Sequence, residues 1–338
     1  MAIYDTTLRD GSQTEGVSFS TEDKLDLLKR LDHFGVDFIE GGWPGSNPKD
    51  VAFFEAASRM PMEHARLVAF GSTRRAGVEA EQDRNLAMLV SSGAPCIAIF
   101  GKTWDLHVTN ALKISLEDNL ELVRDSISYL KAHGKEVVFD AEHFFDGYAR
   151  NPRYALDVLD AAASAGADWL TLCDTNGGTM TADIIKGLEQ VGQSFDVPLG
   201  IHTHNDADLA VANSLAAVEA GATMIQGTIN GLGERCGNAN LCSIIPNLAL
   251  KMGHQVSAPD LSLLTALSAF VAETANVLAD SKLPYVGRSA FAHKGGVHVS
   301  AMMRDERTYE HVSPTVVGNQ RRMLVSELAG TASVLAKV

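Results

Sequence analysis

Two histidines, His202 and His204, stand two residues apart in the segment GIHTHNDADLA. The run VPLGIHTH is short and apolar, and we predict a β-strand that ends at the pair. Because side chains alternate across a strand, residues i and i+2 point to the same side. Two imidazoles on one face can share a metal ion, and histidine is the commonest metal ligand. Two ordinary strand histidines have the same spacing, so the rest of the chain must decide between these interpretations.

Two further motifs carry residue types that complete a metal site. DTTLRDG near the N-terminus contains Arg9 and Asp10, and GLGERCGN, which ends in Asn238, follows the histidine pair. One carboxylate, two imidazoles and one amide make a divalent-metal site with positions open for water or substrate. Mg²⁺ or Mn²⁺ suits the oxygen ligands, whereas Zn²⁺ or Co²⁺ suits the histidines. The alternative is that Asp10 only caps a loop, and that Asn238 only caps the helix that follows Asn238 in the sequence.

An alternation of short apolar runs and longer amphipathic segments fills the first 250 residues. Eight strands are predicted, at residues 2–5, 36–42, 66–71, 96–101, 136–142, 168–174, 198–204 and 223–229. Helices are predicted at 21–34, 116–134, 152–166 and 208–221, with helix-ending glycines at Gly35, Gly134, Gly166 and Gly221. Eight such units predict an α/β fold, a (β/α)8 TIM barrel over residues 1–255. An open doubly wound sheet fits less well, since no GxGxxG follows the first strand.

The pattern changes after about residue 255. LSLLTALSAFVAETANVLAD (261–280) predicts a helix without a following strand, and the segments after it are rich in Gly, His and Arg. We therefore expect a small C-terminal helical subdomain over residues 256–338. It contains His293, His298 and Tyr309, which can exchange protons at the barrel mouth if the subdomain folds over it, in the same chain or in a partner.

Barrel closure brings the chemical motifs together. Active sites of TIM barrels lie at the C-terminal ends of the strands, and the eighth strand pairs with the first. Asp10, the histidine pair and Asn238 therefore become neighbours. The same end of the barrel collects further polar residues, namely Arg9, Glu40, Lys102, His107, Asp140, Glu142, Asp174 and Thr175.

Several of these residues have both a chemical and a structural interpretation. The guanidinium of Arg9 suits a developing enolate or alkoxide oxygen, or else pairs with Glu40 or Asp174. Thr175 can donate its hydroxyl to a substrate carboxylate or cap the next helix. Glu142 can act as acid or base, or orient Arg9. The glycine-rich GLGERCGN can be a mobile loop that closes over a ligand.

Composition excludes several other classes of protein. The formal net charge is −14 and no Lys/Arg-rich block occurs, which argues against nucleic acid or a membrane surface as partner. The four cysteines lack metal-pair spacing, so we expect free thiols in a reducing compartment. No signal peptide is recognised and the apolar runs are shorter than a membrane span. We expect a soluble, cytoplasmic protein.

At this point the chain resembles a known family. DTTLRDGSQ (5–13), HTHND (202–206) and GLGERCGN (231–238) together resemble the DRE-TIM metallolyases, and within them the isopropylmalate, homocitrate and citramalate synthases. GGWPGSNPKD (41–50) and FDAEHFFDGY (139–148) are most similar to citramalate synthases. The resemblance implies a Claisen-type condensation: acetyl-CoA is deprotonated at its methyl group and attacks the ketone of a 2-oxo acid. The thioester is then hydrolysed, and a divalent metal holds the 2-oxo acid.

The resemblance also implies roles for individual residues. Arg9 matches the residue that polarises the ketone, Thr175 the one that binds the substrate carboxylate, and Glu142 the strand-5 glutamate. In AFAHKGGVHVSA (290–301) the second histidine, His298, matches one that assists the chemistry, often across a dimer, and Tyr309 matches the family's subdomain tyrosine. The resemblance therefore implies a homodimer. Four residues match the metal ligands: Asp10, His202, His204 and Asn238.

Departures from the isopropylmalate synthases bear on the substrate. Those enzymes commonly have a smaller residue at Asp140 and a proline at Cys173. We expect Ile99, His107, Asp140 and Cys173 to line the substrate pocket. A buried carboxylate beside a branched apolar chain is costly, which favours pyruvate and hence citramalate, on the route to isoleucine. Isopropylmalate or homocitrate synthesis would keep the mechanism with a larger 2-oxo acid. Full-length relatives carry a C-terminal regulatory domain, which we expect this chain to lack.

Other classes on the same barrel fit less well. An acyl-CoA lyase or aldolase would lack the segment AFAHKGGVHVSA. A biotin-dependent carboxyltransferase would need a metal-carrying lysine, and the sixth predicted strand ends in Cys173 and Asp174 without one. A non-catalytic binding protein would not need the complete ligand set with Arg9.

Overall fold

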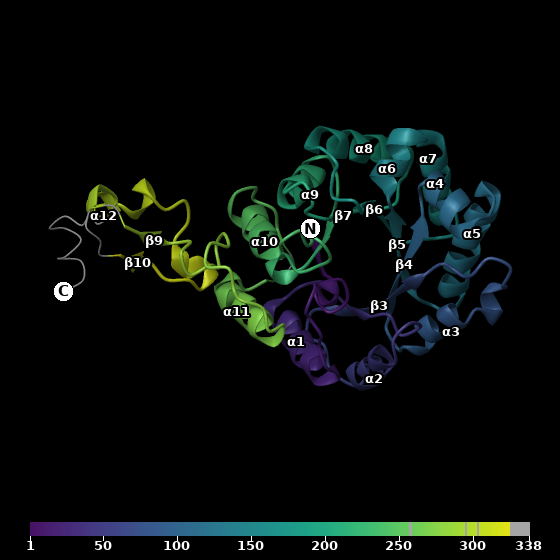
Figure 1. The fold of residues 1–338 in the computed structure, drawn as a ribbon, viewed down its shortest axis with the longest axis horizontal. Helices are drawn as coiled ribbons and strands as arrows, with labels where there is room; N and C mark the ends of the chain where they lie inside the picture. The colour runs from purple at the N-terminus through teal and green to yellow at the C-terminus, as the bar shows by residue number, and fades with distance from the viewer. Residues whose placement is uncertain (257–258, 295, 303, 325–338) are drawn as a thin grey trace.

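A closed barrel of eight parallel strands forms the centre of the molecule, in a computed structural model that describes residues 1–256, 259–294, 296–302 and 304–324 (Figure 1). The strands follow one another around the barrel in sequence order, and β1 pairs with both β2 and β8. The predicted TIM barrel is confirmed, and each strand differs from its predicted range by two residues or fewer at either end. The strands are β1 (Ala2–Asp5), β2 (Phe38–Gly42), β3 (Arg66–Ser72), β4 (Cys96–Lys102), β5 (Glu136–Glu142), β6 (Trp169–Asp174), β7 (Leu199–Thr203) and β8 (Met224–Gly227).

Helices surround the barrel and cover the outer face of its strands (Figure 1). Ser20 and Ser115 begin α1 and α5 with capping boxes, in which the serine hydroxyl and an aspartate three residues later satisfy free backbone N–H groups. The four glycines predicted to end helices all have positive φ. The helices are α1 (Thr21–Phe34), α2 (Pro48–Ala57), α3 (Arg84–Ser91), α4 (Asp105–His107), α5 (Leu116–Ala132), α6 (Phe144–Arg150), α7 (Pro152–Ser164), α8 (Thr181–Ser194), α9 (Ala210–Glu219) and α10 (Leu241–Leu250).

Alternating side chains of the strands fill two separate apolar layers. The outward residues pack against the helices, whereas the inward ones, such as Phe38, Val68 and Met224, fill the barrel. This alternation decides one prediction: Ile99 belongs to the outer layer, and its neighbour Phe100 faces inward. The expectation that Ile99 lines the substrate pocket is therefore wrong by one position along β4.

The chain after α10 first packs on the barrel and then leaves it. The predicted helix at 261–280 is a 3₁₀ turn, η5 (Leu261–Leu263), followed by α11 (Leu264–Thr274), which lies beside α1 (Figure 1). It ends early because Asn276 adopts a left-handed backbone conformation with φ 52°. A hydrogen bond joins it to the barrel, since Asn230 Nδ2 donates to the backbone carbonyl of Ser268 at 2.8 Å.

The described residues beyond α11 form short helices, loops and a two-stranded parallel sheet that extend to one side of the barrel (Figure 1). They contain β9 (Ala292–His293), α12 (Gly296–Met302) and β10 (Arg322–Met323). Residues 325–338 of the predicted subdomain lie outside the described residues, and the division at 255 and 256 stays a prediction. Among the described helices, none is long and apolar enough to cross a membrane. Other short turns are η1 (Gly11–Gln13), η2 (Ala80–Gln82), η3 (Val108–Leu112), η4 (Ile229–Gly231), η6 (Glu306–Thr308) and η7 (Pro314–Val317).

Candidate metal centre

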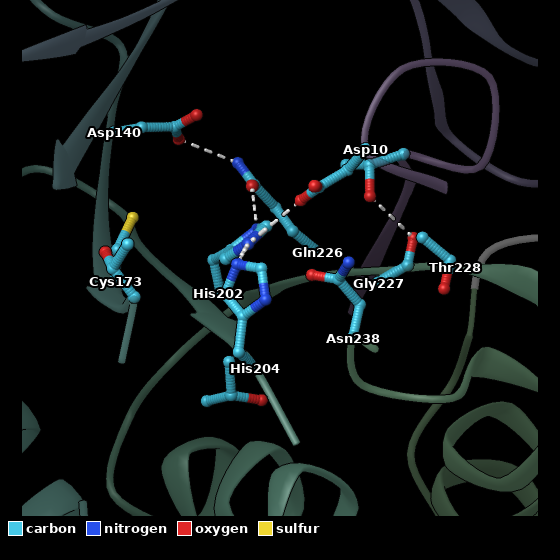
Figure 2. Close-up of polar contacts among 12 residues, drawn as sticks. Asp10, Asp140, Cys173, His202, His204, Gln226, Gly227, Thr228 and Asn238 are labelled. Carbon is cyan, nitrogen blue, oxygen red and sulfur yellow. Dashed lines mark hydrogen bonds and ion pairs between the residues drawn. The ribbon is translucent and has the colours of Figure 1, made fainter. Parts of the chain in front are cut away.

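Three of the predicted metal ligands meet at the C-terminal end of the barrel. Asp10 lies on the turn after β1, and His202 and His204 lie at the end of β7 (Figure 2). Asp10 Oδ2 and His204 Nε2 are each 3.3 Å from His202 Nε2. All three side chains are buried, and one ligand atom from each lies within 4.8 Å of the others. This spacing is close enough for one ion to contact all three residues.

Asn238, the fourth predicted ligand, is held beside His204 by the backbone. The two residues form an isolated antiparallel bridge just beyond the end of β7. The Asn238 amide donates through Nδ2 to the Leu232 carbonyl at 3.1 Å. Its buried Oδ1 has no hydrogen-bond partner among the described residues. A buried oxygen without a donor is costly, and a cation bound there would satisfy it. The donor set of carboxylate, two imidazoles and one amide oxygen fits a divalent metal.

The electrostatics of the cluster favour the metal-binding forms of Asp10 and His204 and oppose that of His202. Burial raises the pKa of Asp10, but the charges of Arg9 and the histidines outweigh it and hold this pKa below its usual value. Burial and the neighbouring His202 lower the pKa of His204 to about 3. Burial also lowers the pKa of His202, but the hydrogen bond and charge of Asp10 reverse this and leave it raised. At neutral pH, Asp10 is thus ionised and His204 neutral, as metal binding requires.

Arg9 is fixed beside these ligands by a buried glutamate. Its Nε donates to Glu40 Oε1 at 2.5 Å, and the Tyr4 hydroxyl donates to Glu40 Oε2 at 2.5 Å. The guanidinium lies over the ring of Phe70, 3.8 Å from its centre, with Nη1 3.5 Å from Asp10 Oδ1. The alternative ion pair with Glu40 is therefore present, and it orients Arg9 toward the cluster rather than away from it.

A cavity of about 250 Å³ opens beside the cluster. Asp140, Cys173 and Thr175 line it, as expected, whereas Ile99 and His107 lie outside it. An aromatic wall completes it: Trp43 packs edge-on against Phe70 and Phe100, 5.7 Å from each ring centre. Sequence reasoning missed this wall. The lining residues are Arg9, Asp10, Gln13, Trp43, Phe70, Phe100, Asp140, Glu142, Cys173, Thr175, His202, His204, Glu234 and Arg235.

Contacts of Thr175 and Glu142 contradict one structural alternative for each residue, and their chemical roles stay predictions. Helix α8 begins at Thr181, so Thr175 does not cap it. The Thr175 hydroxyl oxygen accepts from the His143 amide at 2.8 Å, which leaves its proton free to donate into the cavity. Glu142 pairs with Lys102 at 2.5 Å, its partner in the β4–β5 register, and not with Arg9.

The glycines of GLGERCGN allow a tight turn that presents Asn238. A Cβ at Gly237 would lie 2.0 Å from the Gly231 carbonyl oxygen, and one at Gly233 would lie 2.1 Å from Asn238 Nδ2. The Gly233 amide donates to Thr14 Oγ1 at 2.7 Å, and Arg235 pairs with Asp206 at 2.7 Å. These contacts explain the glycines by close packing. Closure of the loop over a ligand stays a prediction.

Three predicted site residues lie away from the cluster. The ring of His107 stacks on Trp104 at 5.2 Å, and its centre lies 4.3 Å from that of His143. His298, in α12, is exposed and stacks on the ring of Tyr309 at 4.1 Å. Figure 1 shows α12 in the C-terminal region, at a distance from the barrel. The substrate-binding role of His107 and the catalytic roles of His298 and Tyr309 stay predictions.

Gln226 and Glu40 support the cluster from inside the barrel. Gln226 Oε1 accepts from His202 Nδ1 at 2.8 Å, and Gln226 Nε2 donates to Asp140 Oδ1 at 2.8 Å (Figure 2). Burial and the charge of Glu40 raise the pKa of Asp140 to about 6, so this carboxylate stays largely ionised at neutral pH. Gln226 was missed from the sequence, although a glutamine inside the apolar run TMIQGTI is itself a signal of a buried polar role.

Comparison with known proteins agrees with this geometry. Residues 1–271 match the model of the HMGL-like family, and residues 285–338 match that of the homocitrate synthase post-HMGL domain-like family. The chain is therefore a member of the HMGL-like family, and the predicted resemblance to its synthases is confirmed. It is 56% identical over 338 residues to the (R)-citramalate synthase of Aquifex aeolicus, and 48% identical over 335 residues to that of Sulfolobus acidocaldarius.

These alignments cover 99% and 98% of this chain, and the chain spans 64% of each citramalate synthase. Homocitrate synthase AksA of Methanopyrus kandleri is 36% identical, with 99% of this chain and 81% of the relative covered. Among solved structures, an HMG-CoA lyase from Bacillus subtilis superposes with a TM-score of 0.70 at 20% identity, over 82% of this chain and 94% of that one. This structural likeness supports the fold alone.

Proposed function

We propose that the chain catalyses a metal-dependent condensation of acetyl-CoA with pyruvate and water to give (R)-citramalate and CoA. The observation that carries the proposal is the meeting of Asp10, His202, His204 and the unpartnered Asn238 oxygen beside a fixed Arg9. The identities of 48–56% to (R)-citramalate synthases favour this reaction over that of the 36%-identical homocitrate synthase.

In this proposal the four ligands hold a divalent ion, Mg²⁺ or Mn²⁺, with Zn²⁺ or Co²⁺ as alternatives. Such an ion supplies Lewis acidity to the ketone oxygen and an anchor for the substrate. Arg9 donates to the same oxygen as negative charge develops on it, and its fixed position costs no reorganisation at that moment. The Thr175 hydroxyl donates a hydrogen bond to the pyruvate carboxylate. Glu142 exchanges protons with the substrate from the end of β5.

Substrate size is set by the aromatic wall in this proposal. Phe70 and Phe100 stack at 5.5 Å with Trp43 across their edges, so the cavity cannot widen on that side without moving three packed rings. Trp43 is itself anchored, since its Nε1 donates to Asn85 Oδ1 at 2.7 Å. A methyl group fits this cavity better than a branched chain. The preference for pyruvate thus rests on the wall more than on the buried Asp140, whose carboxylate is occupied by Gln226.

Acetyl-CoA would approach through a second cavity. It has a volume of about 270 Å³ and shares Arg9, Gln13 and Trp43 with the first. Polar side chains and Lys49 line its outer part, while Lys24 is already paired with Asp50 at 2.5 Å. In this proposal, a thioester that enters from this side meets the ketone at the residues that both cavities share.

The exposed pair of His298 and Tyr309 completes the site from a second copy of the chain. Both belong to the C-terminal region, whose helix α12 lies away from the barrel in Figure 1. We therefore include a homodimer in the proposal, with α12 of each subunit over the barrel mouth of the other. A cytoplasmic location and a role in isoleucine biosynthesis belong to the same proposal.

The test is CoA release from acetyl-CoA in the presence of Mg²⁺ or Mn²⁺, with pyruvate, 2-oxoisovalerate and 2-oxoglutarate offered in parallel. Preferential release with pyruvate, lost on chelation and in Asp10→Ala, supports the proposal. The matched control is Asp196→Ala, which removes an exposed carboxylate just before β7 and should leave turnover unchanged. Preference for a larger 2-oxo acid would contradict the pyruvate assignment. No release with any of them would contradict the synthase assignment for this chain.

A further inference from the structure

A glutamine is fully buried inside the barrel, directly behind the candidate metal cluster. Gln226 is the register partner of His202 on the neighbouring strand. Its Oε1 lies 2.8 Å from His202 Nδ1, while its Nε2 lies 2.8 Å from Asp140 Oδ1 and 3.3 Å from Thr171 Oγ1 (Figure 2). Both ends of one amide are thus committed to partners on three other strands.

The direction of these hydrogen bonds is fixed by the carboxylate. An ionised carboxylate only accepts hydrogen bonds, so the amide nitrogen of Gln226 must face Asp140. The amide oxygen then faces His202, and Nδ1 of that imidazole must carry a proton to donate to it. A neutral imidazole has one N–H, so His202 Nε2 is left with its lone pair. This is the atom that points toward Asp10 and His204, at 3.3 Å from each.

We propose that Asp140 and Gln226 act as a positioning relay that selects the metal-binding tautomer of His202. Partners of this kind commonly orient a ligating histidine and raise its basicity. Here the neutral amide of Gln226 stands between the histidine and the Asp140 carboxylate. The carboxylate therefore fixes the direction of both hydrogen bonds, and Asp10 stays the carboxylate that contacts the His202 ring. The inference rests on the proposed metal site. It also gives Asp140 a role different from the substrate contact expected from the sequence.

Direct metal titration of the metal-free protein tests the relay without relying on turnover. Gln226→Met has the same charge and a similar size, but it cannot accept from His202, and we expect its Mn²⁺ affinity to fall about 10- to 100-fold. Asp140→Asn lets the amide of Gln226 turn around and should also weaken binding. The matched control is Ile225→Val, an outward-facing neighbour on β8, which should bind Mn²⁺ as the wild type does.

An exchange variant separates the relay from simple barrel packing. In Asp140→Asn combined with Gln226→Glu, the amide at 140 donates to the carboxylate at 226, which accepts from His202 Nδ1. Charge and hydrogen-bond polarity are then restored, and we expect an affinity within about threefold of the wild type, well short of the roughly 10- to 100-fold loss expected for Gln226→Met. Histidine-selective ¹⁵N spectra of the metal-free protein, above the pKa of His202, should show the proton on Nδ1 in wild type and exchange variant, and mixed tautomers in Gln226→Met.

The outcomes are distinguishable. The relay is overturned if Gln226→Met binds Mn²⁺ as tightly as the wild type, or if the exchange variant binds as weakly as Gln226→Met with the fold intact by circular dichroism. If the wild type binds no Mn²⁺, or if Asp10→Ala binds as well as the wild type, the proposed metal site itself fails and the relay fails with it.

Discussion

The barrel mouth and the C-terminal region both contain histidines predicted to act in one site, yet they hold them differently. His202 is buried, with a polar partner at each ring nitrogen. His298 is exposed, and its ring contact is with Tyr309. The first arrangement is finished within one chain. The second becomes a site only when something else covers it. Under the proposed function, metal binding would thus belong to the single barrel, and proton transfer by His298 to the proposed dimer.

The largest effect on kcat/KM is expected at Arg9, because its fixed position is a feature of the barrel mouth that the C-terminal region lacks. Arg9→Lys keeps the charge but loses the bond to Glu40 and the stacking on Phe70, so kcat/KM should fall about 10²- to 10³-fold. Arg66→Lys is the matched control, because Arg66 also pairs with a glutamate and lies over a ring, that of Phe38, at the opposite end of the barrel. Steady-state CoA release measures both. Equal rates in the two variants would contradict a catalytic role for Arg9.

A smaller effect is expected at His298, and it tests the division between chain and assembly directly. His298→Ala should lower kcat by about 10²-fold, the usual range for a positioned acid or base. Mixing it with the inactive Asp10→Ala should restore part of the activity, because a mixed dimer has one mouth with both groups. His133→Ala is the control, since the ring of His133 also contacts that of a tyrosine, Tyr129, at the end of the barrel's own α5. Mixed samples that stay inactive would argue that each chain works alone.

The aromatic wall should control selectivity more than rate. Phe100→Ala enlarges the cavity, and we expect the ratio of kcat/KM for 2-oxoisovalerate to that for pyruvate to rise by about tenfold. This is the lower end of the discrimination that one methylene gives in an apolar pocket. Ile99→Val changes the outward neighbour and should leave this ratio unchanged. Parallel assays with the two acids measure it. An unchanged ratio in Phe100→Ala would remove the wall from the specificity argument.

The smallest effect concerns stability of the metal-free protein against pH. The pKa of His204 is about 3 in the folded chain, below that of an unfolded histidine, so the unfolded state binds more protons between these values. The free energy of unfolding therefore falls as pH drops from about 6.5 toward 3. The raised pKa of His202 acts with the opposite sign and offsets part of this. Denaturant titrations should show a shallower pH dependence for His204→Gln than for the wild type. A steeper one would contradict the assigned environment.

Much of the fold was predictable because the short apolar runs of strands and the helical patterns of apolar residues, with a period of 3.6, alternate throughout the barrel. The inward-facing residues of β4 could not be predicted in this way. The run CIAIFG is apolar on both faces and carries no signal of which residues point into the barrel. The pattern alone therefore does not distinguish Ile99 from Phe100 as the inward residue. The candidate metal cluster could be predicted because two histidines stand out in the apolar run VPLGIHTH, and because barrel closure brings the segments after β1 and β8 beside them. Gln226, whose role depends on a partner on β5, needed the three-dimensional structure.

The C-terminal region was less predictable for a different reason. Its contacts are scattered buried residues such as Val286 and Val317, together with polar pairs such as Arg321 with Glu310 at 2.6 Å, and they form no repeating apolar face. Such contacts leave no period in the sequence. The predicted helix over 261–280 overran Thr274 because LSLLTALSAFVAETANVLAD stays helical in pattern beyond the residue where the backbone turns.

The place of Asp10 and Asn238 at the seam of the barrel has a mechanical consequence. The seam is where β1 and β8 meet, and it is the one junction between neighbouring strands that the chain itself does not connect. A cation shared by Asp10, the end of β7 and Asn238 would act as a clasp across it. Local opening of the N-terminal strand would then require release of the ion. Amide hydrogens of Ala2–Asp5 should therefore exchange more slowly once metal is added, and the first residues of the chain would report on whether the proposed metal site is filled.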